Sequence, residues 1–251
     1  MLKFLDNWRQ RRIDRVAYDS DYFRSTFDRV PALGRLDDLA RYRLLRLTQR
    51  FLHEKRFIGA QGLQLDLAMR TRIAQLACWP VLQLGFEWLR GWREVIVYPE
   101  GFRVHRREWE EDTGLVHDWD EELAGESWDE GPLILSWHDL ENDLDQPQDL
   151  QNVVLHEIAH KLDARSGISD GAPPLPAHID AREWEHVFRT AYEHLCAIVD
   201  HDESLAPIDA YAASAPAEFF AVTSEYHFLA PKILDTAYPD VSRLLRSFYT
   251  G

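Results

Sequence analysis

Apolar positions in the first 92 residues recur at helical spacing. Over residues 37–52, leucines and aromatic side chains stand three or four positions apart with arginines between them, the pattern of an amphipathic helix with a solvated basic face. Glycines and a proline punctuate the segment between residues 59 and 85. We therefore predict an N-terminal helical part over residues 1–92.

The pattern changes after residue 92. Residues 94–99 are β-branched and end at a proline, and residues 131–137 open with Gly-Pro, so both segments are predicted to be strands. The stretch between them is expected to form a hairpin and loop. A helical pattern returns from Gln148 onward, with a surface loop at 167–176.

Two further helices are expected at about 180–199 and 216–229. The layout predicts a mostly helical α+β fold with a small sheet. We expect residues 93–251 to form the core, with residues 1–92 packed on it in one compact unit.

Composition narrows the class of protein. The 251 residues are 45% hydrophobic and 28% charged, which is typical of a globular chain. No apolar run approaches the ~20 residues of a bilayer-spanning helix, and the N-terminus does not have the pattern of a signal peptide. Two cysteines, Cys78 and Cys196, indicate neither a disulfide framework nor a cysteine metal site. We expect a cytoplasmic protein without a membrane segment.

The net charge of -15 is concentrated in one stretch. Residues 108–145 contain 15 acidic residues and no Lys or Arg, which leaves 28 acids against 28 bases elsewhere. Such a stretch is typical of a solvated surface loop, and the alternative is an acidic rim that steers basic substrates or a basic partner. Both interpretations argue against direct nucleic-acid binding, because phosphate contacts need clustered cations.

Residues 155–160 carry the pattern H-E-x-x-H. His156 and His160 lie ~40° apart on one face of a helix, one turn from each other, so both imidazoles can reach one ion. Glu157 is offset from that face and can hold a water molecule without being a ligand. The pattern predicts a hydrolytic zinc site with one open position. The alternative is a pair of core histidines bonded to carboxylates.

A third protein ligand is needed, and spacing alone does not choose it. The metzincin continuation is excluded, because Asp163 and Ser166 stand where Gly and His would be. A carboxylate from the helix near 216–229 is the other route, with Ser214 as its expected N-cap. Glu218 and Glu225 are seven residues apart and share one helix face, so both remain candidates, each with a solvent-exposed position as its alternative.

Several motifs resemble a known family. Residues 156–163, the run Glu218-Phe219-Phe220-Ala221 and residues 224–226 are similar to the Mlc titration factor A family of bacterial zinc peptidases, related in its catalytic domain to anthrax lethal factor. The resemblance covers most of the chain, and its specific motifs lie in 131–228. It implies a gluzincin site whose third ligand is Glu218, with Tyr211 as a catalytic tyrosine. It also implies binding to the Mlc glucose repressor.

Roles follow for the individual side chains. Glu157 is expected to take a proton from the attacking water and pass it to the leaving amine. The phenol of Tyr211 can donate a hydrogen bond to the developing oxyanion, although a packed surface aromatic is its alternative. Asp163 could orient an imidazole, or could be a helix-terminal charge. Glu225 is expected either to contact a ligand side chain without binding the metal itself or to lie in solvent.

The sequence leaves three alternative functions open. The first is a zinc peptidase acting on a peptide or protein substrate, with one zinc per chain, either as an endopeptidase or as an exopeptidase such as an aminopeptidase. The second is a regulatory protein that binds and sequesters the repressor. The third, a structural zinc protein, fits poorly because two imidazoles, one carboxylate and a general base leave the fourth position open.

Overall fold

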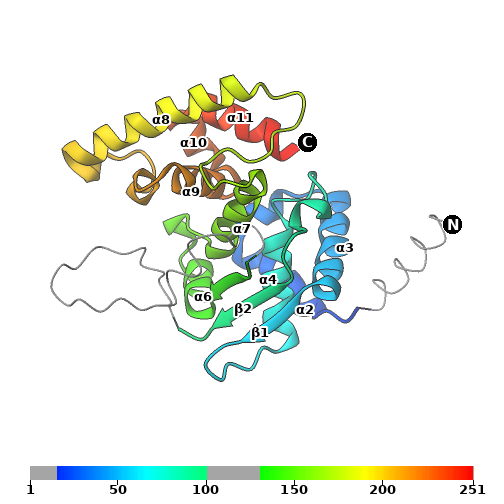
Figure 1. The fold of residues 1–251 in the computed structure, drawn as a ribbon. Coiled ribbons are helices and arrows are strands. Elements are labelled where there is room, and N and C mark those ends of the chain that lie inside the picture. Colours follow the sequence, from blue (N-terminus) through cyan, green and yellow to red (C-terminus); the bar gives the residue numbers. More distant parts are fainter. Residues whose placement is uncertain (1–15, 101–130, 251) are drawn as a thin grey trace.

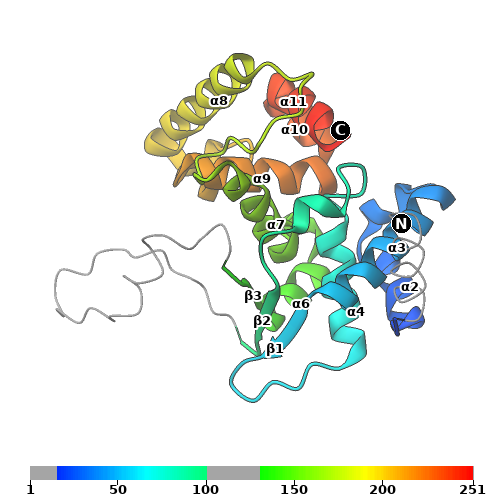
Figure 2. The same ribbon diagram turned by 45° about the vertical axis from the view of Figure 1, so that its right-hand side comes forward.

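The computed structural model of the chain describes residues 16–100 and 131–250. Helix α7 runs through the middle, between a part that contains the sheet with α2, α3, α4 and α6 and a part made of α8 to α11 (Figures 1 and 2). The elements are α2 (Ser20–Arg29), α3 (Asp38–Glu54), β1 (Arg56–Gly59), α4 (Leu67–Cys78), β2 (Glu94–Tyr98), β3 (Leu133–Ser136), α6 (Trp137–Asp145), α7 (Val153–Asp163), α8 (Ala181–Asp202), α9 (Pro216–Leu229), α10 (Pro231–Ala237) and α11 (Pro239–Thr250), with short 3-10 turns that include η6 (Ala210–Ala213).

The three described strands form a parallel sheet in the order β1-β2-β3. Val95 and Val97 of β2 and Leu133 and Leu135 of β3 are buried, whereas the alternate Ile134 is partly exposed. One face of the sheet therefore belongs to the hydrophobic core. Strand β1 corrects the expectation of an all-helical segment over 1–92. It has only four residues, and the first of them, Arg56, is exposed. So short a segment shows no alternation of buried and exposed positions, and its pairing with β2 is what defines it as a strand.

The predicted strands at 94–99 and 131–137 are confirmed with shorter ends. Strand β3 stops at Ser136 because the Ser136 hydroxyl accepts a hydrogen bond from Asp139 N at 3.1 Å and caps α6. Residues 137–145 are thus a helix, and the interpretation of the acidic stretch as a surface loop is wrong for them. The hairpin and loop expected between the strands lie in 101–130, outside the described residues.

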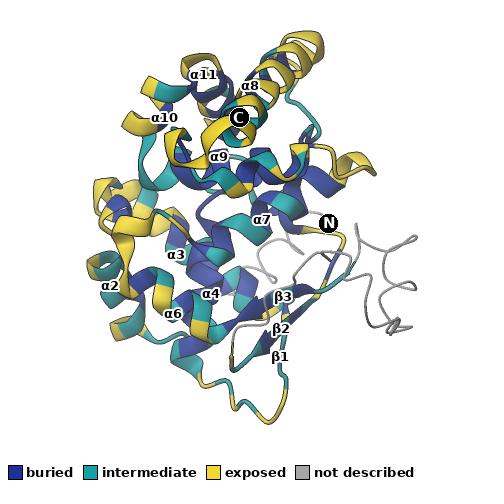
Figure 3. Cartoon of the chain, turned by 90° about the vertical axis from the view of Figure 1, so that its left-hand side faces the viewer, coloured by how far each residue is buried: buried dark blue, intermediate teal, exposed yellow. Residues whose placement is uncertain are grey.

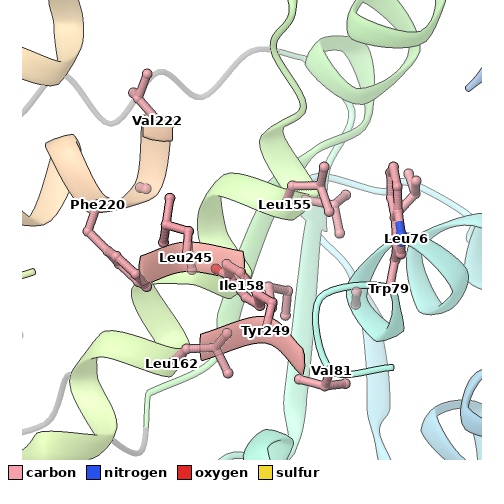
Figure 4. Packing of buried hydrophobic residues seen from close by; sticks show 14 of the residues in the cluster. Leu76, Trp79, Val81, Leu155, Ile158, Leu162, Phe220, Val222, Leu245 and Tyr249 are labelled. Atoms are coloured by element: carbon pink, nitrogen blue, oxygen red, sulfur yellow. The ribbon is translucent and has the colours of Figure 1, made fainter. Parts of the chain in front are cut away.

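Helix α7 is buried along its apolar positions. Leu155, Ile158 and Leu162 belong to one hydrophobic cluster that includes Leu76 and Trp79 near the end of α4 and Leu245 and Tyr249 of α11 (Figure 4). The Asn152 side chain caps the helix by accepting from Leu155 N at 3.0 Å. The backbone of α7 is therefore held both along its length and at its start. This sets the positions from which its polar side chains project.

Helix α9 is buried on almost every side. Residues 217–226 are all buried, including both glutamates; Figure 3 shows buried positions concentrated on the inner helices and exposed ones on α8 and α11. The solvent-exposed alternative for Glu218 and Glu225 is therefore wrong. Ser214 is not the N-cap: Ala215 occupies that position, and the Ser214 hydroxyl donates to Tyr211 O at 2.7 Å.

The helices expected at 180–199 and 216–229 are confirmed, the first extending to Asp202. Within the described ranges, no helix combines the length and the apolar character that a bilayer crossing requires.

Candidate active site

Three donor atoms converge between α7 and α9. The Nε2 atoms of His156 and His160 lie 3.1 Å apart, and Glu218 Oε2 lies 3.0 Å from the first and 3.1 Å from the second. The two histidines stand one turn apart on α7, and Glu218 stands in the first turn of α9. The glutamate is 2% exposed, so its carboxylate is held inside the protein by the helix that carries it.

The spacing of these atoms fits a tetrahedral metal ion. Ligands at about 2.0–2.1 Å from a tetrahedral zinc stand about 3.3 Å from one another, close to the 3.0–3.1 Å between the three atoms here. Two imidazoles and one carboxylate are also a donor set typical of catalytic zinc. The residues present therefore fit such an ion, with His156, His160 and Glu218 as the group that could hold it.

Glu225 approaches the same histidine from its other nitrogen. Its Oε1 lies 2.8 Å from His156 Nδ1, and its Oε2 accepts a hydrogen bond from Asn152 N at 2.5 Å. A carboxylate only accepts hydrogen bonds, so Nδ1 is the protonated nitrogen and Nε2 of a neutral His156 points its lone pair at Glu218. The two candidate glutamates thus contact opposite edges of His156, and only Glu218 contacts both histidines.

The site holds protons when it holds no cation. Burial lowers the pKa of His156, but hydrogen bonds with Glu218 and Glu225 outweigh burial and raise the pKa to about 10. Burial likewise raises the pKa of Glu218, but the hydrogen bonds with both histidines hold this pKa well below its usual range. A metal ion that takes the place of these protons satisfies the same lone pairs, and its binding releases protons.

Glu157 and Tyr211 line the cavity in front of the histidines. The cavity measures about 130 Å³. The Tyr211 ring lies 6.1 Å from the His156 ring, is 48% exposed, and is held by a hydrogen bond from its backbone N–H to Asp209 Oδ1 at 2.9 Å. The lining residues are Pro132, Ile134, His156, Glu157, His160, Lys161, Ala164, Ser169, Tyr211 and Glu218.

Sequence reasoning missed part of this lining. Lys161 and Ala164 follow His160 by one and four residues, and the second spacing is a signal that was available, because a helical turn brings position i+4 to the same face. Lys161 Nζ donates to Gly131 O at 2.8 Å, which ties the start of β3 to the histidine helix. Ile134 and Ser169 come from a strand and a loop, and no pattern along the chain relates them to α7.

Asp163 does not orient an imidazole by hydrogen bonding. It is fully buried, its Oδ2 accepts from Gly171 N at 2.8 Å, and neither its Oδ1 nor His160 Nδ1 has a hydrogen-bond partner within the described part of the chain. Burial raises the pKa of Asp163 to about 7 despite that hydrogen bond. Asp163 is the last residue of α7, as the helix-terminal alternative expected, but its side chain faces the interior.

Known proteins match this chain over most of its length. The family model described as "Glucose-regulated metallo-peptidase M90" matches residues 5–250. Proteins named Mlc titration factor A are similar: that of Cronobacter sakazakii is 44% identical over 88% of this chain and 82% of its own, and that of Klebsiella pneumoniae is 42% identical over the same shares. The one from Salmonella arizonae is 40% identical over 93% and 92%. The chain belongs to this family of metallopeptidases.

Proposed function

We propose that the protein is a zinc-dependent peptidase in which His156, His160 and Glu218 hold one zinc ion and Glu157 is the general base. The observation that carries the proposal is the convergence of the two Nε2 atoms and Glu218 Oε2 at 3.0–3.1 Å. Glu157 lines the cavity in front of these atoms. Membership of a metallopeptidase family supports the same reaction class.

Zinc in such a site supplies Lewis-acid chemistry, which lowers the pKa of water and polarises a carbonyl group. The protein's own groups supply the proton transfers. Glu157 takes a proton from the attacking water and delivers it to the nitrogen of the leaving amine, so the leaving group departs as a neutral amine and not as an amide anion. The Tyr211 hydroxyl donates a hydrogen bond to the oxyanion that forms on the scissile carbonyl. Glu225 keeps His156 in the tautomer whose Nε2 is free to bind metal.

The substrate is expected to lie extended along β3. A cavity of about 130 Å³ accepts only a small part of a peptide, so the rest of the substrate must lie on the surface beside it. Strand β3 stands at an edge of the sheet formed by the described strands, and its Ile134 lines the cavity. Backbone groups on that edge can pair with an extended peptide. We therefore expect the substrate to lie along residues 131–137.

A second candidate function is regulatory binding. The relatives at 40–44% identity carry the name Mlc titration factor A. By that similarity, this chain would bind the Mlc repressor and act in the cytoplasm. It would bind neither a membrane nor nucleic acid directly. A Glu157→Gln variant separates the two functions, because it is expected to keep repressor binding while losing peptide cleavage.

Metal analysis beside a peptide assay tests the proposal. We expect about one zinc per gently purified chain, loss of the metal in His156→Ala and His160→Ala, and cleavage of a fluorogenic peptide library that a chelator abolishes and zinc restores. Paired peptides with free and acetylated N-termini distinguish aminopeptidase from endopeptidase action. A protein that takes up no zinc, or whose cleavage resists chelation, contradicts the proposal.

A further inference from the structure

The loop between α7 and α8 is held at Gly171 by two buried side chains. Gly171 N donates to Asp163 Oδ2 at 2.8 Å, and Gly171 O accepts from Trp184 Nε1 at 3.1 Å. Asp163 is 0% exposed and Trp184 is 1% exposed. Both peptide groups of this residue are therefore fixed from inside the protein, one by the end of α7 and the other by α8.

The third neighbour of Gly171 is the start of α9. A Cβ atom built on Gly171 would lie 2.7 Å from Pro216 O and 3.2 Å from Pro216 C. Pro216 is the first residue of α9 and follows the N-cap Ala215, whose carbonyl accepts from Phe219 N at 3.0 Å. The atoms that the Cβ would meet are backbone atoms, so no side-chain rotation can relieve the contact.

This contact joins the two helices that carry the three candidate metal ligands. Asp163 lies three residues after His160 on α7, and Glu218 lies two residues after Pro216 on α9. The start of α9 thus lies close against Gly171, and Gly171 is hydrogen-bonded to the end of α7 through Asp163. The distance between the histidines and Glu218 consequently depends on how closely Pro216 approaches Gly171.

We propose that Gly171, held by Asp163 and Trp184, is a positioning residue that sets the start of α9 and thereby brings Glu218 Oε2 to the two histidines. The inference rests on the proposed metal site. Real Cβ atoms essentially never lie within 3.0 Å of another atom and ordinary contacts begin near 3.4 Å, so an alanine at position 171 requires the two segments to separate by about 0.3–0.7 Å. Metal–ligand distances tolerate only about 0.2 Å. The displacement is therefore large enough to weaken the metal site without touching a ligand.

Gly62 provides a matched control. It has φ +82°, against +83° for Gly171, but a Cβ atom at Gly62 meets nothing within 4 Å. Alanine at either position carries the same left-handed backbone strain. Only Gly171→Ala adds the collision with α9. A difference between the two variants therefore reports the contact and not the strain.

The experiment measures zinc affinity by competition with a chromophoric chelator for the full-length wild type, Gly171→Ala and Gly62→Ala. We expect a zinc Kd about 10–100-fold higher in Gly171→Ala and wild-type affinity in Gly62→Ala. Trp184→Phe is the second variant, because it removes the Nε1 donor while keeping a ring that can stack on Phe188, whose ring lies 4.2 Å away. We expect its Kd to rise less than that of Gly171→Ala.

The outcomes separate the two proposals. A wild type that binds no zinc overturns the proposed function and this inference with it. A wild type that binds zinc, with Gly171→Ala binding as tightly as Gly62→Ala, overturns the positioning role alone. If Gly171→Ala does not fold, Trp184→Phe decides: a raised Kd supports the role, and unchanged zinc affinity overturns it.

Discussion

Four carboxylates surround the paired histidines, and their surroundings give each a different task. Glu218 lies between the two Nε2 atoms, and Glu225 joins His156 Nδ1 to Asn152 N. Asp163 turns to Gly171. Glu157 lines the cavity, where a substrate and a water molecule can reach it. Position relative to the histidine nitrogens, and not residue type, distinguishes the proposed ligand, orienting group and base.

The first prediction concerns Glu157. Replacement by Gln keeps the size of the side chain but removes a group that can accept a proton. We expect Glu157→Gln to retain one zinc per chain and to lose about 10²–10⁴-fold in kcat. Steady-state kinetics beside elemental analysis measures both quantities. Wild-type turnover in this variant would show that another group is the base.

The spacing of single residues predicted part of the site. The four-residue separation of His156 and His160 was sufficient, because a helix places such residues on one face whatever surrounds it. The choice between Glu218 and Glu225 was not available from spacing, because residues seven apart also share a face. It depends on where α9 crosses α7, which packing determines. The resemblance to a family supplied Glu218, and its role as a ligand stays a prediction.

At the scale of elements, the first turn of α7 is held by carboxylates from its neighbours. Asp143 of α6 accepts from Val153 N at 2.7 Å, and Glu225 of α9 accepts from Asn152 N. Both satisfy donors at a helix start that would otherwise lack a partner. The histidine helix is therefore oriented from both sides at its start, three residues before His156.

The second prediction follows from the burial of Asp143. Burial raises its pKa to about 7, although the hydrogen bond from Val153 N lowers it. Between about pH 4 and about pH 7 the folded protein binds more protons at this group than the unfolded chain does, so its contribution to stability is lost as pH rises. Asn keeps an acceptor for Val153 N and carries no charge. We expect Asp143→Asn to have a Tm about 2–4 °C higher at pH 8 and little changed at pH 4.

Thermal melts of the metal-free protein across pH 4–8 measure this difference, with Asp145→Asn as the control. Asp145 is on the same helix, and its side chain is 73% exposed in an ion pair with Arg29. Its replacement should not raise the Tm at pH 8. A lower Tm for Asp143→Asn at pH 8 would show that the negative charge at the start of α7 stabilises more than its burial costs.

The third prediction concerns the edge of β3. A peptide that adds to this strand uses the N–H of every second residue, because alternate backbone groups point toward the partner strand. N-methylation scanned along an uncleaved peptide bound to Glu157→Gln should therefore weaken binding at alternate positions. Calorimetric Kd values measure the effect. Loss of affinity without a two-residue period would place the substrate elsewhere.

Elements with a strong period were predictable, and short ones were not. The helix at 180–199 carries a long amphipathic period and the helix at 216–229 a long apolar run, and both are present. Strand β1 has only four residues, and helix α6 has nine residues that are mostly polar. The first is made by pairing with β2 and the second by the Ser136 cap. The pairing partner of β1 lies nearly 40 residues away in the sequence, whereas the Ser136 cap is a local signal that the strand interpretation of 131–137 concealed.

At the scale of the whole molecule, the sheet joins both parts of the chain. Strand β1 comes from the segment placed in the N-terminal helical part, and it pairs with β2 from the segment placed in the core. Both segments also contribute to one hydrophobic cluster. The division at residue 92 is still a prediction, and these contacts lead us to expect that the two parts unfold together.

The fourth prediction is a single calorimetric transition that zinc shifts as a whole. A ligand at 100 times its Kd stabilises by about 2.7 kcal/mol, which corresponds to a Tm increase of roughly 5–10 °C for a chain of this size. Differential scanning calorimetry with and without zinc measures it. Two transitions, only one of which responds to zinc, would mean that residues 1–92 and 93–251 are independent domains.

In the proposed site, Glu218 holds the metal together with the two histidines and Glu225 does not. Zinc titration of Glu218→Gln and Glu225→Gln tests it most directly, since both changes preserve volume in buried positions and remove one charge each. We expect Glu218→Gln to lose high-affinity zinc binding, because a neutral amide is a poor substitute for the carboxylate ligand. Glu225→Gln should still bind one zinc, about 10–100-fold more weakly at most. The reverse ranking, with zinc retained by Glu218→Gln and lost by Glu225→Gln, would contradict the account.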